Sequence, residues 1–241
     1  MKILFLIVAR GGSKGIPGKN IRKIGGIPLV GFKAISARRS RYCSRLIIST
    51  DSSEIQQVAR GYEVEVPFTR PADLATDTSS TADVIMHAMS WIENNTNEQY
   101  DAVMLLEPSS PFARHIDYDN GVELMMERDA NVVVGMRQME VNSAVIGPMD
   151  EQGRITGIID QMLNTQGVRR QDFEPEYTMN GALYLFKWNF FKEHKAIYKD
   201  REKTFGYVMD RHYSIEIDEM VDLHWAEFLV NNGYVDLSYW Q

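Results

Sequence analysis

Short apolar runs alternate with amphipathic stretches through the first half of the chain. Buried strands are expected at the apolar runs of residues 3–9, 45–49, 102–106 and 131–136, and a half-exposed strand at 63–66. Between them, helices are expected at the 3.6-residue patterns of 29–39, 54–60, 81–92 and 117–128. Strands that alternate with helices predict an α/β fold with a parallel sheet covered by helices.

The pattern changes between residues 138 and 176. Apolar runs become short, and glycine and proline interrupt the segment before a further strand is expected at 179–186. Ile155, Ile158 and Leu163 still need burial, so we expect an inserted arm for dimerisation or a lid rather than a floppy surface insertion. The chain is predicted to form a single domain, 1–241, that carries this arm.

Composition narrows the class of protein. The 241 residues, 44% hydrophobic and 24% charged, suit one large globular domain, and the net charge of -7 argues against a general nucleic-acid binder. The first apolar run is too short to span a bilayer, so no signal peptide or transmembrane helix is expected. The single cysteine excludes an internal disulfide and fits a reducing compartment. We expect a soluble cytoplasmic protein without nucleic-acid or membrane partners.

The loop that follows the first strand reads Arg-Gly-Gly-Ser-Lys-Gly-Ile-Pro-Gly-Lys-Asn from Arg10 to Asn20. Its glycines permit sharp turns and close-range N–H groups, while Arg10, Lys14 and Lys19 add positive charge. Such a loop suits a polyphosphate. The P-loop pattern does not fit, because Ser13 stands where glycine is required and Asn20 where a hydroxyl is required. Taken alone, the loop is equally compatible with an ordinary solvated turn.

Further polar segments are expected at the same sheet edge, because ligands of open α/β sheets bind outside the carboxyl ends of the strands. They are residues 49–51, 107–111 and 70–81. The last supplies a fourth cation and several hydroxyl groups for a nucleotide. It also contains Ser80, which forms a capping box with Asp83. The alternative for this segment is therefore a solvated lead-in to a helix, and that alternative explains Ser80.

Near the C-terminus, Glu216 and Asp218 alternate with isoleucines and therefore share one face of a predicted strand. Neighbouring carboxylates repel unless a cation lies between them, and oxygen ligands suit Mg²⁺ held partly by substrate phosphates. The alternative is a pair of exposed positions before a helix that begins with Glu219 and Asp222. Together with a polyphosphate loop, the metal interpretation is favoured. The histidines show no metal-ligand or nucleophile spacing.

In combination, these blocks resemble the acylneuraminate cytidylyltransferases, the CMP-sialic acid synthetase family. The glycine loop matches the opening signature of the family. Five further blocks follow in the family's order, at residues 48–51, 70–81, 105–111, 180–184 and 215–218. Their order and spacing make the resemblance far more specific than any single motif.

The resemblance implies a Rossmann-like nucleotidyltransferase fold, with a mostly parallel mixed sheet, helices on both faces and a homodimer formed through the arm. It implies the reaction of CTP with a nine-carbon α-keto acid sugar to give CMP-sugar and pyrophosphate, with Mg²⁺, or Mn²⁺ in its place, as cofactor. The resemblance implies that the catalytic residues are Arg10, Lys19 and Asp218 and that the metal ligands are Glu216 and Asp218. The implied nucleotide-binding residues are Arg10, Gly11, Gly12, Ser13, Lys14, Lys19, Asn20, Arg70 and Thr81. The implied sugar-binding residues are Glu107, Ser109, Ser110, Arg170, Gln171 and Asn180.

Three positions depart from the family's pattern for sialic acid. Glu216 stands where an aspartate is usual, Glu107 where many members have glutamine, and Thr178 where an arginine for the sugar is frequent. These departures favour a legionaminic or pseudaminic acid over N-acetylneuraminate. Two other functions stay open: a sugar nucleotidyltransferase that uses another NTP or a sugar 1-phosphate, and a nucleotide-binding homologue without catalysis.

Overall fold

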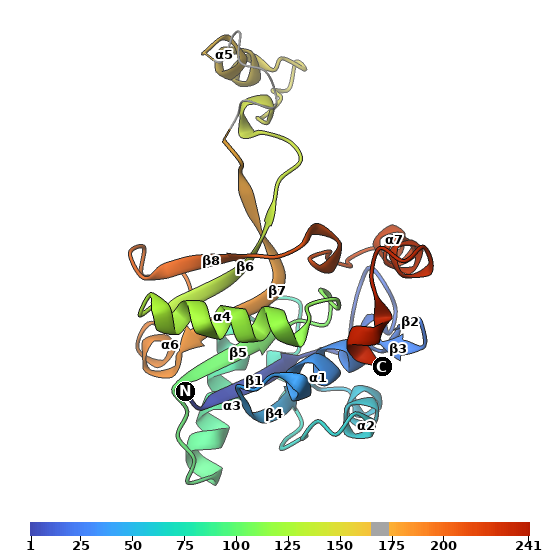
Figure 1. Ribbon diagram of the computed structural model, residues 1–241, viewed down its shortest axis with the longest axis vertical. Helices are drawn as coiled ribbons and strands as arrows, with labels where there is room; N and C mark the ends of the chain where they lie inside the picture. Colours follow the sequence, from blue (N-terminus) through green and yellow to red (C-terminus); the bar gives the residue numbers. More distant parts are fainter. Residues whose placement is uncertain (165–173) are drawn as a thin grey trace.

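The computed structural model describes residues 1–164 and 174–241, and its centre is a six-stranded sheet (Figure 1). β1 runs parallel to its neighbours β4 and β5, and β6 runs parallel to β8, whereas β7 is antiparallel to β5 and β6. The mixed sheet implied by the resemblance is confirmed, and the purely parallel sheet is wrong, because the chain returns from β6 through the arm into β7 in the opposite direction. In spatial order the strands are β4 (Cys43–Ser49), β1 (Ile3–Val8), β5 (Ala102–Leu106), β7 (Tyr177–Lys187), β6 (Val132–Gln138) and β8 (Thr204–Val208).

Helices cover both faces of this sheet. Alternate residues of β1 point to opposite faces: Phe5 and Ile7 contribute to one apolar cluster, and Leu4 and Leu6 to another. The first cluster is completed by α1 (Leu29–Arg39), α2 (Ser53–Gly61) and α4 (His115–Glu127), and the second by α3 (Thr81–Asn95) and α6 (Trp188–His194). The helices predicted in the first half of the chain are confirmed. The Ser80 hydroxyl accepts a hydrogen bond from the Asp83 amide at 3.1 Å, as its capping box predicts.

A third apolar cluster joins the C-terminal part of the chain to the glycine loop. It includes Ile16 from the loop, Ile217 from the acidic segment and Leu223 from α7 (Met220–Asn231). The small hairpin of β2 (Lys23–Ile24) and β3 (Ile27–Pro28) lies beside α7, and its turn consists of two glycines with positive φ. This packing brings residues more than 190 positions apart in the sequence to the same edge of the sheet.

Two of the predicted strands are wrong. Residues 63–66 form only a single bridge, between Glu65 and Ile47, since Glu63 adopts a left-handed φ of 58° and Pro67 lacks an N–H group. The segment at 215–218 is extended but joins no sheet, and the Ile217 amide donates instead to the carbonyl oxygen of Ser109 at 2.8 Å. The alternation predicted there persists without a sheet, because the isoleucines are buried and the two acidic residues are exposed.

Residues 139–164, which follow β6, project away from the sheet and carry α5 (Thr156–Asn164) near the far end of the projection (Figure 1). Several of their apolar side chains are exposed, among them Met149, Ile159 and Leu163. None of the helices in the described parts of the chain combines the length and apolar character needed to cross a membrane.

Candidate active site

Two adjoining cavities lie at the carboxyl ends of β1 and β5. The first, of about 530 Å³, is lined by the glycine loop, Glu107, Glu216 and Asp218. The second, of about 310 Å³, is lined by the segment between Arg70 and Thr81 and shares Arg10 and Glu107 with the first. The structure therefore brings together the loop, the hydroxyl-rich segment and the acidic pair that the sequence places far apart.

The glycine loop is held in shape by its own neighbours. The Gly11 amide donates to Asp51 at 2.9 Å, the Ser13 amide donates to the Gly11 carbonyl, and the buried Asn20 side chain donates to the Arg10 carbonyl at 2.9 Å. Three residues predicted to bind the nucleotide thus use these groups to fix the loop. Gly12 has open space where a side chain would stand.

A close approach links the loop to the acidic segment. Gly15 lies against the backbone of Asp218, so that a methyl group on Gly15 would overlap the Asp218 carbonyl oxygen. The Lys19 ammonium, whose side chain is only 16% exposed, lies 2.9 Å from the Ile217 carbonyl oxygen and 3.0 Å from an Asp218 carboxylate oxygen. A predicted phosphate ligand and a predicted metal ligand are therefore direct neighbours.

The other two loop cations share one carboxylate. Arg10 and Lys14 each lie 2.6 Å from a different oxygen of Asp77. These cations hold the pKa of Asp77 below its usual range. Sequence reasoning missed a role for Asp77, since it is one acidic residue among hydroxyls in the 70–81 segment.

Arg70 forms the wall of the second cavity. Its guanidinium is buried and donates to the hydroxyl of Ser49 at 3.0 Å and also to the Ser49 carbonyl. Burial lowers the pKa of Arg70 below its ordinary value. Thr81, at the first turn of α3, lines the same cavity, so Arg10, Arg70 and Thr81, three of the residues that the resemblance implies for the nucleotide, meet there.

The residues predicted for the sugar divide into two groups. Glu107 and Ser109 line the first cavity, whereas Ser110 and Asn180 are buried and support the backbone around Gly181. Gly181 has a φ of 65°, and a methyl group there would lie 2.9 Å from the Ser110 hydroxyl and 3.0 Å from a Glu216 oxygen. Ser110 and Asn180 therefore shape the cavity from behind. The predicted sugar ligands Arg170 and Gln171 lie outside the described residues.

Burial and charge perturb the acidic groups. Burial, reinforced by the charge of Glu216, raises the pKa of Glu107 to about 7, although Lys33 and Lys19 oppose the rise. Burial and the neighbouring Asp218 raise the pKa of Glu216. A carboxyl group whose ionisation is disfavoured by a neighbouring carboxylate is suited to a divalent cation.

Lys33 is a residue of the site region that sequence reasoning missed. It lies fully buried on α1, donates to the Ala182 carbonyl oxygen at 3.0 Å, and has its pKa lowered by burial to about 7. The one signal in the sequence is a lysine on an otherwise apolar helix face. That pattern predicts a buried lysine but not its partner.

The metal interpretation rests on Glu216 and Asp218. Within residues 1–164 and 174–241, no three potential protein ligands come together, so a bound ion would need further ligands from the substrate. Mg²⁺ is commonly held by one or two carboxylates together with substrate phosphates. The oxygen donors of this pair therefore fit Mg²⁺ bound with a nucleotide.

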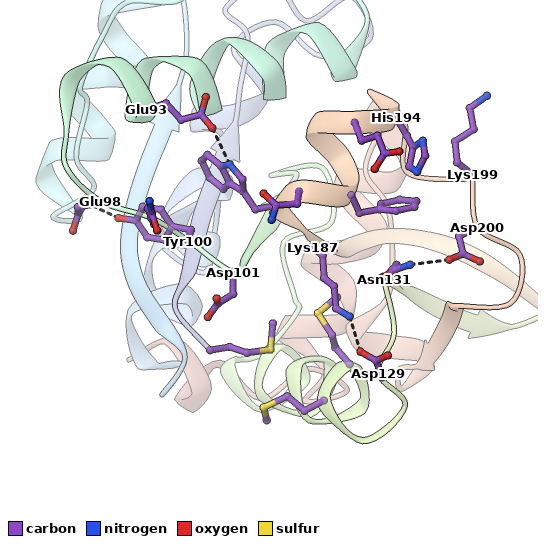
Figure 2. A pocket seen from close by; sticks show the side chains of 18 of the residues that line it. Glu93, Glu98, Tyr100, Asp101, Asp129, Asn131, Lys187, His194, Lys199 and Asp200 are labelled. Carbon is purple, nitrogen blue, oxygen red and sulfur yellow. Dashed lines mark hydrogen bonds and ion pairs between the residues drawn. The ribbon is translucent and has the colours of Figure 1, made fainter.

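A larger cavity lies at the opposite edge of the sheet, near the starts of β5 and β6, and measures about 1240 Å³ (Figure 2). Some of its polar side chains pair with one another: Lys187 with Asp129 at 2.7 Å, and Asn131 with Asp200 at 2.7 Å. None of the residues predicted for phosphate or metal lines it. The candidate chemistry belongs to the two smaller cavities.

Comparison with known proteins agrees with this geometry. A family described as cytidylyltransferase matches residues 4–234. The CMP-N,N'-diacetyllegionaminic acid synthase of Legionella pneumophila is 30% identical over 226 residues, which cover 94% of each chain. The pseudaminic acid cytidylyltransferase of Campylobacter jejuni is 28% identical over 229 residues, 95% of this chain and 96% of that one.

Solved structures show the same fold. CMP:2-keto-3-deoxy-manno-octonic acid synthetase, complexed with CTP, superposes with a TM-score of 0.69 at 15% identity and covers 97% of this chain and 100% of that one. The 4-diphosphocytidyl-2C-methyl-D-erythritol synthase of Anaerococcus prevotii has a TM-score of 0.65 at 12% identity, over 95% and 96% of the two chains. The expected nucleotidyltransferase fold is confirmed, and the chain belongs to the cytidylyltransferase family of enzymes.

Proposed function

We propose that this enzyme transfers CMP from CTP to a nine-carbon α-keto acid sugar and releases pyrophosphate. The observation that carries the proposal is the junction of Lys19 with Asp218, which joins a cationic phosphate loop to an acidic metal pair across one cavity. The names of relatives at 28 to 30% identity support a sugar of the nonulosonic acid class.

The loop cations perform the nucleotide chemistry. Arg10, Lys14 and Lys19 surround the first cavity and neutralise the triphosphate, which lowers the repulsion that an attacking oxygen meets. The same cations stabilise the charge that develops on the departing pyrophosphate. Positioning and charge stabilisation suffice for such a transfer, so no covalent nucleophile is required.

Glu216 and Asp218 would hold Mg²⁺, with Mn²⁺ as a substitute. When bound, the ion would polarise the α-phosphate and lower the pKa of the sugar's anomeric hydroxyl. Asp218 also keeps the Lys19 ammonium at the mouth of the loop, and the absence of a side chain at Gly181 leaves room for the Glu216 carboxylate.

The sugar carboxylate needs a cation on the side of the cavity opposite the loop. Arg137 of β6 lies directly opposite Thr178 in the antiparallel register of β6 and β7. Directly opposed residues share one face of a sheet, and the charge of Arg137 acts on Glu216. We assign the sugar carboxylate to Arg137, which stands beside the position where the family often carries its arginine.

The acidic Glu107 favours a particular substituent pattern. A carboxyl group that is half-ionised near neutral pH accepts hydrogen bonds from amide or hydroxyl groups of the sugar and, when charged, repels its carboxylate. N,N'-diacetyllegionaminic acid, which is named in two relatives, carries two N-acetyl groups where N-acetylneuraminate carries one, so the further amide donor supports a legionaminic- or pseudaminic-type acid. The legionaminic and pseudaminic relatives point in the same direction.

The arm supports a homodimer. Met149 is 69% exposed and Leu163 61%, and exposed apolar side chains of this size on a projecting segment favour contact with a second copy. A cytoplasmic location is supported by the single cysteine, whose thiol pKa is raised by burial to about 12 and which is therefore unreactive.

The decisive experiment is Mg²⁺-dependent pyrophosphate release, with each of the four NTPs against legionaminic, pseudaminic, neuraminic and deoxy-octulosonic acids. We expect release only with CTP and a legionaminic- or pseudaminic-type acid. Release with another NTP or only with a sugar 1-phosphate would assign a different nucleotidyltransferase activity. Binding of CTP without release on any sugar would indicate a non-catalytic homologue.

A further inference from the structure

One carboxylate occupies the charged mouth of the phosphate loop. The two oxygens of Asp77 are divided between Arg10 and Lys14, both at 2.6 Å, although Asp77 and Arg10 stand 67 residues apart in the sequence. Arg10 lines both cavities, and Asp77 lines the second. The Asp77 carboxylate therefore stands at the boundary through which a triphosphate would reach the loop.

The Asp77 carboxylate binds Arg10 and Lys14 in the way that a phosphate group of a nucleotide would bind them. Within the described parts of the chain, the Asp77 carboxylate has no hydrogen-bond donor other than these two side chains. It is 45% exposed, and exposed ion pairs contribute little to stability because water screens them. Its release from the loop therefore requires no rearrangement of buried groups.

The segment around Asp77 keeps its shape by other contacts. The Ser79 hydroxyl donates to the Asp73 carbonyl at 2.7 Å and accepts from the Thr76 amide at 3.1 Å. The Thr76 and Ser79 hydroxyls lie 2.7 Å apart. Since these bonds do not involve the Asp77 side chain, rotation of that side chain leaves the segment folded.

We propose that Asp77 is a displaceable counter-ion of the phosphate loop, which holds Arg10 and Lys14 in the free enzyme and is exchanged for the triphosphate when the nucleotide binds. This inference rests on the proposed function, because it takes the loop as the triphosphate site. Exchange weakens nucleotide binding, since two ion pairs are broken and the displaced carboxylate still repels the phosphates. Asp77 therefore sets the affinity for the nucleotide.

The test is the variant Asp77→Asn, which keeps the size of the side chain and removes its charge. Dissociation constants of CTP and of inorganic pyrophosphate are measured by calorimetry without divalent cations, so that any contribution of Asp77 to a metal is excluded. We expect both ligands to bind about three- to tenfold more tightly than to the wild type, and we expect high salt to reduce the difference.

Asp129→Asn is the matched control. Asp129 also divides its two oxygens between two cations, Lys187 at 2.7 Å (Figure 2) and Lys203 at 2.5 Å, but it lies at the opposite edge of the sheet. This variant is expected to bind both ligands as the wild type does. Thermal unfolding of both variants verifies that they fold.

Equal or weaker binding of CTP and pyrophosphate to Asp77→Asn would overturn the inference, because the carboxylate would then orient the loop rather than compete with its ligand. The two hypotheses remain separable. If pyrophosphate binds more tightly to the variant while CTP binds to neither protein, the counter-ion exchange stands and the proposed function fails.

Discussion

The ε-amino group of Lys33 lies 3.0 Å from the carbonyl oxygen of Ala182, at a position with no exposure to solvent. This hydrogen bond joins α1 to the part of β7 that follows Gly181. A methyl group on Gly181 would press on both Ser110 and Glu216. A buried amine thus supports the backbone on which the acidic side of the active site is built.

The first prediction concerns stability as a function of pH. Burial lowers the pKa of Lys33 to about 7, against about 10.4 in the unfolded chain. At pH values between these two, the unfolded state binds a proton that the native state lacks, so the free energy of unfolding increases as pH rises. Lys33→Met removes this contribution, and its stability relative to wild type is expected to fall from pH 7 to pH 10 in urea unfolding followed by tryptophan fluorescence.

Lys23→Met is the control, since Lys23 is an exposed lysine of β2. Its unfolding free energy is expected to follow the wild-type curve at every pH. Parallel curves for Lys33→Met and wild type would show that Lys33 keeps an ordinary pKa in the folded protein.

The second prediction concerns Glu107. Its pKa of about 7 means that the carboxyl group is mostly neutral below neutral pH and charged above it. Since the charged form repels the carboxylate of the sugar, the KM for the sugar is expected to rise between about pH 6 and pH 8. Glu107→Gln is expected to flatten this rise, because glutamine carries no charge at any of these pH values. If Glu107→Gln shows the same pH profile as the wild type, another group causes the rise in the KM for the sugar.

The third prediction tests Gly181. Alanine is strained at its φ of 65°, and the new methyl group would press on Ser110 and Glu216. Gly233→Ala is the control, because Gly233 has a φ of 75° and nothing within 4 Å of the added carbon. We expect about 1 kcal/mol of destabilisation in the control and about 1 to 3 kcal/mol more in Gly181→Ala, which also loses turnover. Equal losses of stability in the two variants would mean that the backbone around Gly181 shifts to accept the methyl group without disturbing Ser110 or Glu216.

The fourth prediction concerns the acidic pair. Asp218→Asn removes the charge that pairs with Lys19 and half of the proposed metal site, and turnover at saturating CTP is expected to fall about 100-fold. The concentration of Mg²⁺ for half-maximal rate is expected to rise. Asp236→Asn, at an exposed turn near the C-terminus, serves as control because asparagine keeps its capping function. Near-wild-type turnover of Asp218→Asn would falsify the assignment.

The fifth prediction concerns Arg137. If this guanidinium receives the sugar carboxylate, Arg137→Met raises the KM for the sugar about tenfold or more and leaves the KM for CTP unchanged. Arg154→Met is the control, since Arg154 lies on the arm and pairs with Asp150. An unchanged KM for the sugar in Arg137→Met would mean that another residue binds the sugar carboxylate. Steady-state kinetics with each substrate varied in turn provides the measurement.

The sequence predicted the local elements well and the long-range relations poorly. The helix at 29–39 and the strand at 102–106 have the bounds that their patterns indicate, because both form from contiguous residues with a clear period. The strand at 63–66 failed, since a short half-exposed strand depends on a neighbouring strand that local sequence does not specify. The antiparallel direction of β7 could not be predicted either, because the hydrophobic pattern of a strand carries no information about the direction of the strand in its sheet.

The sequence alone determined the cationic glycine loop, the alternation that exposes Glu216 and Asp218, and the order of blocks that identifies the family, because each is written in adjacent residues. Only the tertiary structure decided that Lys19 meets Asp218, 199 residues later, and that Asp77 meets Arg10 and Lys14. It also decided the burial of Lys33 and Glu107, and with it their shifted pKa values. Ion pairs and desolvation depend on distance in space and on exclusion of water, and both arise only when the sheet, its helices and the C-terminal segment close around one edge.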